Sequence, residues 1–108
     1  MKSCFIEKTS ATRIAIADVC DYYRQGYIIT RINVPESERG KGIGNKLLKE
    51  ILNAADEEGM NLFLEIRPSG EMNYGDLEAW YCRNGFKKWN GMYRRRPNVQ
   101  RTRQNANS

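Results

Sequence analysis

A glycine-rich block that joins an alternating segment to a helical one is the most constraining feature of this sequence. Residues 27–34 alternate as a strand does, and Pro35 ends the pattern. The polar block 36–44 follows, and then the apolar positions of a helix with one buried face: Leu47, Leu48, Ile51, Leu52 and Ala55. A strand, a glycine turn and a helix N-terminus form an anion site, because the first N–H groups of a helix lack partners within it.

The remaining elements follow from alternation and turn residues. Strands are predicted at residues 4–8 and 13–19, with only a short loop between them, and at 61–67, 86–89 and 92–95, the last two flanking Asn90-Gly91. Asp76 is the expected N-cap of a second helix that carries Leu77, Trp80 and Tyr81. The order is strand, strand, strand, helix, strand, helix, strand, strand, which makes an α/β (α+β) domain.

The strand at 27–34 has two predicted faces. Ile28, Thr30, Ile32 and Val34 share one face, and Ile29, Arg31 and Asn33 share the other.

Charge divides the chain into two parts. The 108 residues carry a net charge of +5, and residues 94–108 hold five arginines and no acid, so residues 1–93 balance 13 basic with 13 acidic residues. From Pro97 on, no apolar periodicity remains to bury a core. We therefore predict one folded domain over residues 1–97 and a disordered basic tail over residues 98–108.

Several classes of protein are excluded by residue usage. The chain has no histidine, which excludes histidine triads and histidine metal sites. The three cysteines, Cys4, Cys20 and Cys82, form no C-x-x-C pair, so we expect neither a disulfide framework nor a metal site. No apolar run is long enough to span a bilayer, and no secretory signal is present, so we expect a cytoplasmic protein with no membrane partner.

Two segments carry a family resemblance. The glycine block lacks the P-loop pattern, and Asn45 stands where a dinucleotide fingerprint needs its last glycine. Instead, Arg39-Gly40-Lys41-Gly42-Ile43-Gly44 resembles the [QR]-x-x-G-x-[GA] signature of the GNAT superfamily of N-acetyltransferases. Residues 80–86, WYCRNGF, resemble that family's F-Y-x-x-x-G-F segment, and the likeness runs from about Tyr27 to Pro97. On its own, the glycine block is equally well interpreted as a surface turn.

The resemblance implies a fold, a cosubstrate and a site. The fold is a GNAT-like mixed, mostly antiparallel sheet, and the cosubstrate is acetyl-CoA, with no metal. Its pyrophosphate would lie on the N–H groups of the glycine block, and its pantetheine arm along the preceding strand. The implied binding residues are Ile32, Asn33, Val34, Arg39, Gly40, Lys41, Gly42, Ile43, Gly44 and Asn45.

Catalytic candidates are few. By resemblance, Tyr81 protonates the departing thiolate, and a phenol with a pKa near 10 is protonated at neutral pH; its alternative interpretation is a core aromatic. For a general base, Glu65 faces away from its apolar neighbours and could act through a water, with Glu36 and Glu71 as loop alternatives. Without a histidine to activate it, Cys82 is interpreted as a small filler and not as a nucleophile.

The chain departs from the family pattern at its start. Family members commonly place helices between their first strands, and the residues between 8 and 13 leave no room for them. This implies an open acceptor face, as in small phage-encoded members, which would work in the host cytoplasm. We expect a monomer or homodimer that acetylates a macromolecular amine, chiefly a protein lysine. The alternatives are a nucleic-acid-directed protein, suggested by the arginine-rich end, and a CoA-binding domain without activity.

Overall fold

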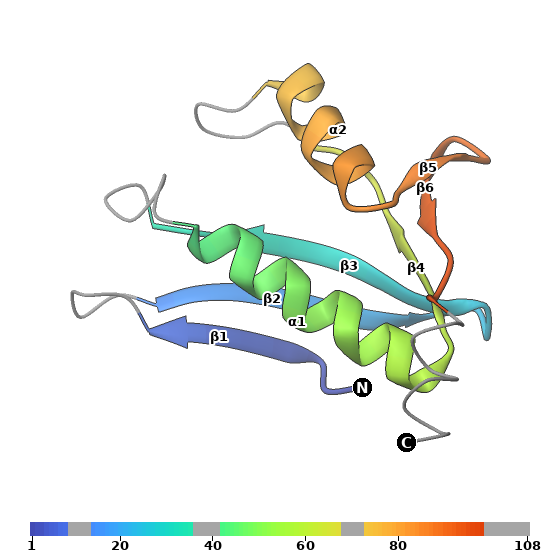
Figure 1. The fold of residues 1–108 in the computed structure, drawn as a ribbon, viewed down its shortest axis with the longest axis horizontal. Helices are drawn as coiled ribbons and strands as arrows, with labels where there is room; N and C mark the ends of the chain where they lie inside the picture. The colour runs from blue at the N-terminus through green and yellow to red at the C-terminus, as the bar shows by residue number, and fades with distance from the viewer. Residues whose placement is uncertain (9–13, 36–41, 68–72, 99–108) are drawn as a thin grey trace.

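The computed structural model describes residues 1–8, 14–35, 42–67 and 73–98 (Figure 1). Within them the predicted order of elements is confirmed. The strands are β1 (Cys4–Lys8), β2 (Ile14–Tyr22), β3 (Gly26–Asn33), β4 (Asn61–Leu64), β5 (Lys87–Trp89) and β6 (Met92–Arg95), and the helices are α1 (Ile43–Glu58) and α2 (Tyr74–Arg83).

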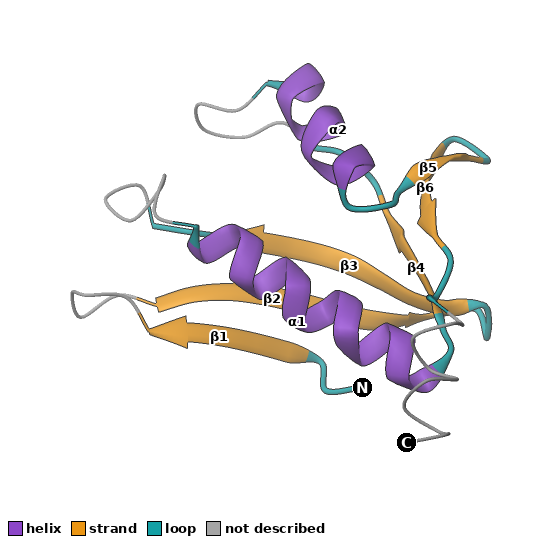
Figure 2. Cartoon of the chain, in the orientation of Figure 1, coloured by secondary structure: helices purple, strands orange, loops and turns teal. Residues whose placement is uncertain are grey.

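All six strands form one sheet in the order β1-β2-β3-β4-β6-β5. Only β3 and β4 pair in parallel, and α1 connects them, while every other neighbouring pair is antiparallel (Figure 2). The mixed, mostly antiparallel sheet is therefore confirmed. No helix among the described residues is long and apolar enough to span a membrane.

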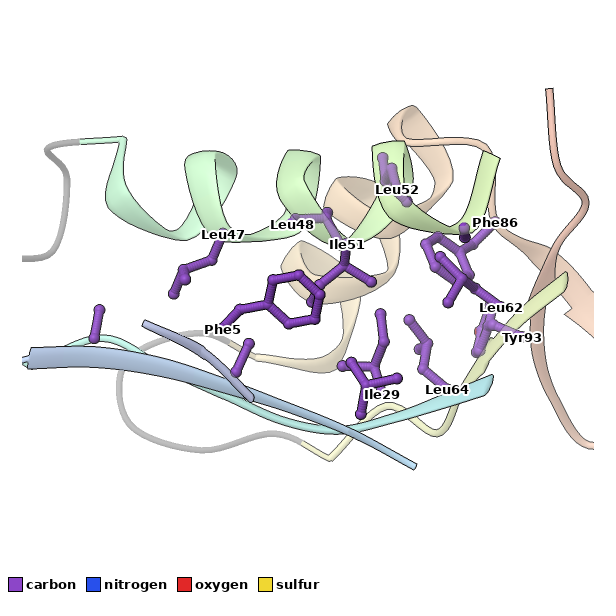
Figure 3. Close-up of a cluster of buried hydrophobic side chains, with 14 residues drawn as sticks. Phe5, Ile29, Leu47, Leu48, Ile51, Leu52, Leu62, Leu64, Phe86 and Tyr93 are labelled. Atoms are coloured by element: carbon purple, nitrogen blue, oxygen red, sulfur yellow. The ribbon is translucent and has the colours of Figure 1, made fainter. Parts of the chain in front are cut away.

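The main core lies between α1 and one face of the sheet (Figure 3). The helix buries the side chains that its periodicity predicted: Leu47, Leu48, Ile51, Leu52 and Ala55. Beneath it, β2 presents its small residues, since Ala15 and Ala17 are fully buried, whereas Ile14 on the other face is 46% exposed. Small side chains on β2 let the helix approach the sheet closely.

A β-bulge in β3 breaks the alternation that the sequence suggested. Asp18 of β2 faces Arg31, and the next residue, Val19, faces Ile29, so Thr30 is an extra residue in β3. The Thr30 hydroxyl donates to the Asp18 carbonyl at 3.3 Å. Ile29 and Ile32, which unbroken alternation places on opposite faces, consequently both pack against the main core.

A second, smaller cluster covers the opposite face of the sheet. The ring of Phe63, fully buried on β4, lies 4.7 Å from that of Tyr22 and 5.2 Å from that of Trp89. The Tyr22 hydroxyl contacts the sulfur of buried Met92 at 3.4 Å. This cluster fixes the β5–β6 hairpin to the sheet.

The C-terminal end of α1 is joined to β6 by a buried ion pair. The Arg95 guanidinium meets the Asp56 carboxylate at 2.8 and 3.1 Å, and the Asn98 N–H donates to the same carboxylate at 2.8 Å. Asp56 is only 2% exposed. The predicted tail at 98–108 lies outside the described residues, apart from Asn98.

Candidate active site

A cleft opens where β3 and β4 part. The two strands pair only from Gly26 with Asn61 to Ile29 with Leu64. Beyond that point β3 continues to Asn33, whereas the chain after Leu64 leaves the sheet, three residues earlier than the predicted end of this strand at residue 67. The gap between them holds a cleft of about 420 Å³, lined by Ile28, Ile29, Thr30, Arg31, Ile32, Leu64, Glu65, Arg67, Leu77 and Tyr81.

One wall of this cleft is the edge of β3. Residues 31–33 pair with β2 on one side, and residues 30–33 have no strand partner among the described residues on the side toward β4. Backbone groups on such an edge can pair with an extended ligand as a further strand would. Of the three residues assigned to this role by resemblance, Ile32 lines the cleft, while Asn33 and Val34 lie just beyond its lining.

The opposite wall is α2, which brings Tyr81 into the cleft. This helix begins one turn earlier than predicted, because Asn73 and not Asp76 is its N-cap: the Asn73 side chain accepts from the Asp76 N–H at 2.8 Å. At the other end of the helix, Tyr81 packs against the core with its ring 5.7 Å from that of Phe86. The side chain of Tyr81 thus contributes to the core and also lines the cleft, and its role as an acid stays a prediction.

Burial raises the pKa of Tyr81 to about 12. Among the described residues its hydroxyl has no hydrogen-bond partner. The phenol is consequently a protonated donor throughout the neutral and mildly alkaline range, with its hydrogen available to a group in the cleft.

Glu65 lines the same cleft as Tyr81. Its side chain is 55% exposed and meets Arg67 at 3.2 Å, so it stands where solvent enters. The loop alternatives Glu36 and Glu71 lie outside the described residues.

The N-terminus of α1 has the features of an anion-binding site. Gly42 is its N-cap, in the left-handed conformation (φ 78°), with no side-chain cap and no acid in the first turn. The first helical bond runs from the Lys46 N–H to the Gly42 carbonyl at 3.0 Å, so the N–H groups of Ile43, Gly44 and Asn45 precede it. The other predicted members of the block, Arg39, Gly40 and Lys41, lie outside the described residues.

Trp80 connects this helix end to the cleft. Its indole N–H donates to the Asn45 side-chain oxygen at 2.5 Å, and its ring lies 4.8 Å from that of Tyr81. The amide oxygen of Asn45, a predicted binding residue, is thus occupied by the indole. Trp80 places the N-terminus of α1 beside the tyrosine-bearing turn of α2.

A hydroxyl chain holds α2 on the sheet. The Tyr93 hydroxyl of β6 donates to the Glu78 carboxylate, so the Tyr74 hydroxyl, 2.7 Å away, donates to Tyr93. Burial and the bond to Glu78 raise the pKa of Tyr93 above its ordinary value. This chain of hydroxyls could not be predicted from the sequence, because Tyr93 lies 15 positions from Glu78 and 19 from Tyr74.

Three further residues line the cleft and were not predicted from the sequence. Arg31 and Arg67 each lie a few residues beyond the last pair of the parallel β3–β4 ladder, and Leu77 is on α2. The available signal was a charged residue at the same end of two neighbouring parallel strands. Arg31 is held by Asp18 at 2.7 Å.

The cysteines are free, with Cys20 and Cys82 exposed. Within residues 1–8, 14–35, 42–67 and 73–98, no cluster of acidic and cysteine side chains could hold a metal ion.

The connection between β1 and β2 is short. The last and first residues of these strands, Lys8 and Ile14, face each other in the ladder. Only residues 9–13, which lie outside the described residues, connect the two strands.

Comparisons with known proteins identify the family and show the same fold in solved structures. The sequence matches the family model of the acetyltransferase (GNAT) domain over residues 2–88. No curated protein matches the chain. Among solved structures, the fold is similar to that of the anti-CRISPR protein AcrVA5, with a TM-score of 0.62 and 19% identity over 86% of this chain and 98% of that one.

Two larger proteins share the fold. The ribosomal-protein-S18-alanine N-acetyltransferase from Escherichia coli is 21% identical, with a TM-score of 0.63 over 77% of this chain and 51% of that one. A GNAT-family acetyltransferase from Staphylococcus aureus Mu50 is 17% identical, with a TM-score of 0.59 over 76% of this chain and 58% of that one. This chain thus spans little more than half of either enzyme. Because the family model covers most of the sequence, the protein belongs to the GNAT acetyltransferase family.

Proposed function

We propose that the protein is an acetyl-CoA-dependent N-acetyltransferase that transfers the acetyl group directly to an amine, with a protein lysine as the acceptor. The observation that carries the proposal is the cleft at the parting of β3 and β4. In one space it joins an unpaired strand edge, a protonated tyrosine and an exposed carboxylate.

The residues present are suited to bind acetyl-CoA, the acetyl donor. The uncapped N-terminus of α1 offers N–H groups and the positive end of a helix dipole to a pyrophosphate. The β3 edge offers backbone hydrogen bonds to an extended pantetheine arm, and Trp80 keeps the two parts of the site adjacent.

The chemistry assigns one role to each side of the cleft. The lone pair of the amine nitrogen attacks the thioester carbonyl carbon, a C–N bond forms and the C–S bond breaks. Tyr81 donates its proton to the departing sulfur, and the surplus proton of the amine passes through water to Glu65. Positioning the two reactants and supplying an acid each lower the barrier.

A protein lysine is proposed as the acceptor because the mouth of the cleft is open to solvent. Glu65 and Arg67 at the mouth are largely exposed, and the hairpin between β1 and β2 is short. A lysine side chain on a protein surface can enter such a mouth, and the exposed carboxylate would meet its ammonium group before deprotonation.

The test is Tyr81→Phe, with Tyr27→Phe as the matched control. Tyr27 is also on the sheet, but its hydroxyl donates to Glu58 at 2.9 Å, away from the cleft. We expect Tyr81→Phe to lower kcat by about 10²- to 10⁴-fold with little change in KM, and the control to leave kcat unchanged.

The acceptor is identified by acetyl-site mass spectrometry of a cell lysate incubated with the protein and acetyl-CoA. Acetylated lysines that depend on Tyr81 would support the proposal. Equal turnover by Tyr81→Phe would show that Tyr81 only packs, and binding of acetyl-CoA without any acetylated product would identify a CoA-binding domain instead.

A further inference from the structure

The β5–β6 hairpin carries a basic pocket that the acetyl-transfer site does not use. Its volume is about 420 Å³, and it is lined by Gly85, Lys87, Lys88, Trp89, Arg94 and Arg96. Four of these six residues are cationic, and none is an acid. Figure 1 shows the hairpin and the N-terminus of α1 at opposite ends of the molecule, so the pocket is separate from the proposed pyrophosphate site.

The cations in this pocket are brought together against their own repulsion. Lys87 and Arg94 are directly opposite in the β5–β6 ladder, and like charges at such positions are unfavourable. Within the described part of the chain, Lys87, Arg94 and Arg96 form no ion pair, and Lys88 meets Glu78 only at 3.8 Å. A bound polyanion would relieve this repulsion.

Arg94 is held in place before any ligand arrives. Its guanidinium lies 5.0 Å from the centre of the Trp89 ring, which packs on the buried ring of Phe63. A guanidinium fixed by stacking loses little freedom when it binds, and its planar fork of donors matches a phosphate group.

We propose that this hairpin binds the phosphate backbone of a nucleic acid. A single small anion would engage only part of the pocket, whereas a polynucleotide presents regularly spaced phosphates to several cations at once. The sequence beyond the pocket continues this character, with Arg101 and Arg103 and no acid. Lysines on an edge strand also discourage edge-to-edge pairing, but that role requires neither the arginine–tryptophan stack nor a pocket.

The first test measures the salt dependence of binding. The full-length protein is titrated against labelled mixed-sequence DNA, single-stranded and duplex, from low to physiological salt. The pocket variant combines Lys87→Gln, Arg94→Gln and Arg96→Gln. Its matched control combines Arg24→Gln, Lys8→Gln and Lys49→Gln, which removes the same charge from other exposed positions.

We expect the pocket variant to bind single strands with a log–log salt slope shallower by about 2, since each neutralised phosphate contributes about −0.7. The control should keep the slope of the unaltered protein. If both triple variants weakened DNA binding equally, binding would depend on net charge alone and not on the pocket. No binding at low salt would overturn the proposal. A Lys87→Gln, Arg96→Gln double variant tests the pocket with the Trp89 stack intact. Its salt slope should also be shallower than that of the unaltered protein, by about half or more of the difference expected for the triple variant.

The second test locates the ligand by the two tryptophan indole N–H signals in NMR spectra. We expect DNA to shift the Trp89 signal and acetyl-CoA to shift the Trp80 signal, so either proposal can fail without the other. Polyglutamate is the competitor: if it shifts Trp89 as strongly as DNA at equal charge, the pocket recognises acidic protein surfaces and the nucleic-acid proposal is wrong.

Discussion

Truncating the buried acid Asp56 should destabilise the protein far more than truncating an acid in an exposed ion pair. Its carboxylate is 2% exposed and accepts two bonds from Arg95 and one from the Asn98 N–H. Asp56→Ala would leave the Arg95 guanidinium, itself only 13% exposed, without its carboxylate. The penalty is the cost of a desolvated and unpaired charge, not merely of a lost contact.

The magnitude follows from burial. Breaking one partner of a buried ion pair costs about 3–5 kcal/mol, against a total stability of about 5–15 kcal/mol for a domain. At about 4–8 °C per kcal/mol for a domain of this size, Asp56→Ala should lower Tm by at least about 12 °C. The double variant Asp56→Leu, Arg95→Met should recover much of this loss, because it leaves no unpaired charge.

The assay is urea unfolding followed by circular dichroism, with Asp18→Ala as the control. The Asp18–Arg31 pair has a similar separation, 2.7 Å, but its side chains are 31% and 53% exposed, so its loss should cost under about 1 kcal/mol. Equal destabilisation by Asp56→Ala and Asp18→Ala would refute the reasoning, and so would a double variant less stable than Asp56→Ala.

Two further predictions concern backbone contact and pH. Gly26→Ala should unfold or severely destabilise the protein, because a Cβ there would lie 2.1 Å from the Asn61 carbonyl oxygen at the start of the parallel pairing; a urea midpoint close to that of the unaltered protein would contradict this close approach. For Tyr81, the pKa is raised from about 10 in the unfolded chain to about 12 by burial, so its contribution is fully present below pH 10 and is lost as pH rises toward 12. Unfolding free energy should therefore fall by about 1.4 kcal/mol per pH unit in that window, a fall that Tyr81→Phe should reduce; identical pH profiles for the two proteins would rule out the buried phenol as its source.

Periodicity predicted the parts of the fold that depend on one helix face or one strand at a time. The five buried apolar positions of α1 recur at helical spacing, and the Asn90-Gly91 turn marks the β5–β6 hairpin. Periodicity failed where one residue interrupts a pattern. The extra residue Thr30 leaves no trace in composition, yet it reverses the faces of the second half of β3.

Contacts between segments that are distant in the sequence were the other feature that the sequence did not predict. In the sequence, Asp56 cannot be distinguished from any other acid in the last turn of a helix. Its partner Arg95 is on β6, 39 positions later. The choice between Asn73 and Asp76 as the cap of α2 depended on one hydrogen bond, since either residue type can cap a helix.

The sequence predicted some residues of the candidate site but not the basic pocket. Tyr81 and Glu65 were chosen from resemblance and alternation, and the structure brings both to one cleft, although their roles stay predictions. The basic pocket was not predicted, because the balanced charge of residues 1–93 averages over its two lysines, and its two arginines belong to the arginine-rich stretch of residues 94–108.

The central claim is that the α1 N-terminus and the β3 edge bind acetyl-CoA, and thermal unfolding with and without acetyl-CoA tests it most directly. At a concentration of about 100 times the dissociation constant, binding to the folded state alone adds about 2.7 kcal/mol, or a rise in Tm of about 10 °C or more. The account predicts such a rise for acetyl-CoA at millimolar concentration. An unchanged Tm with both acetyl-CoA and CoA at that concentration would contradict it.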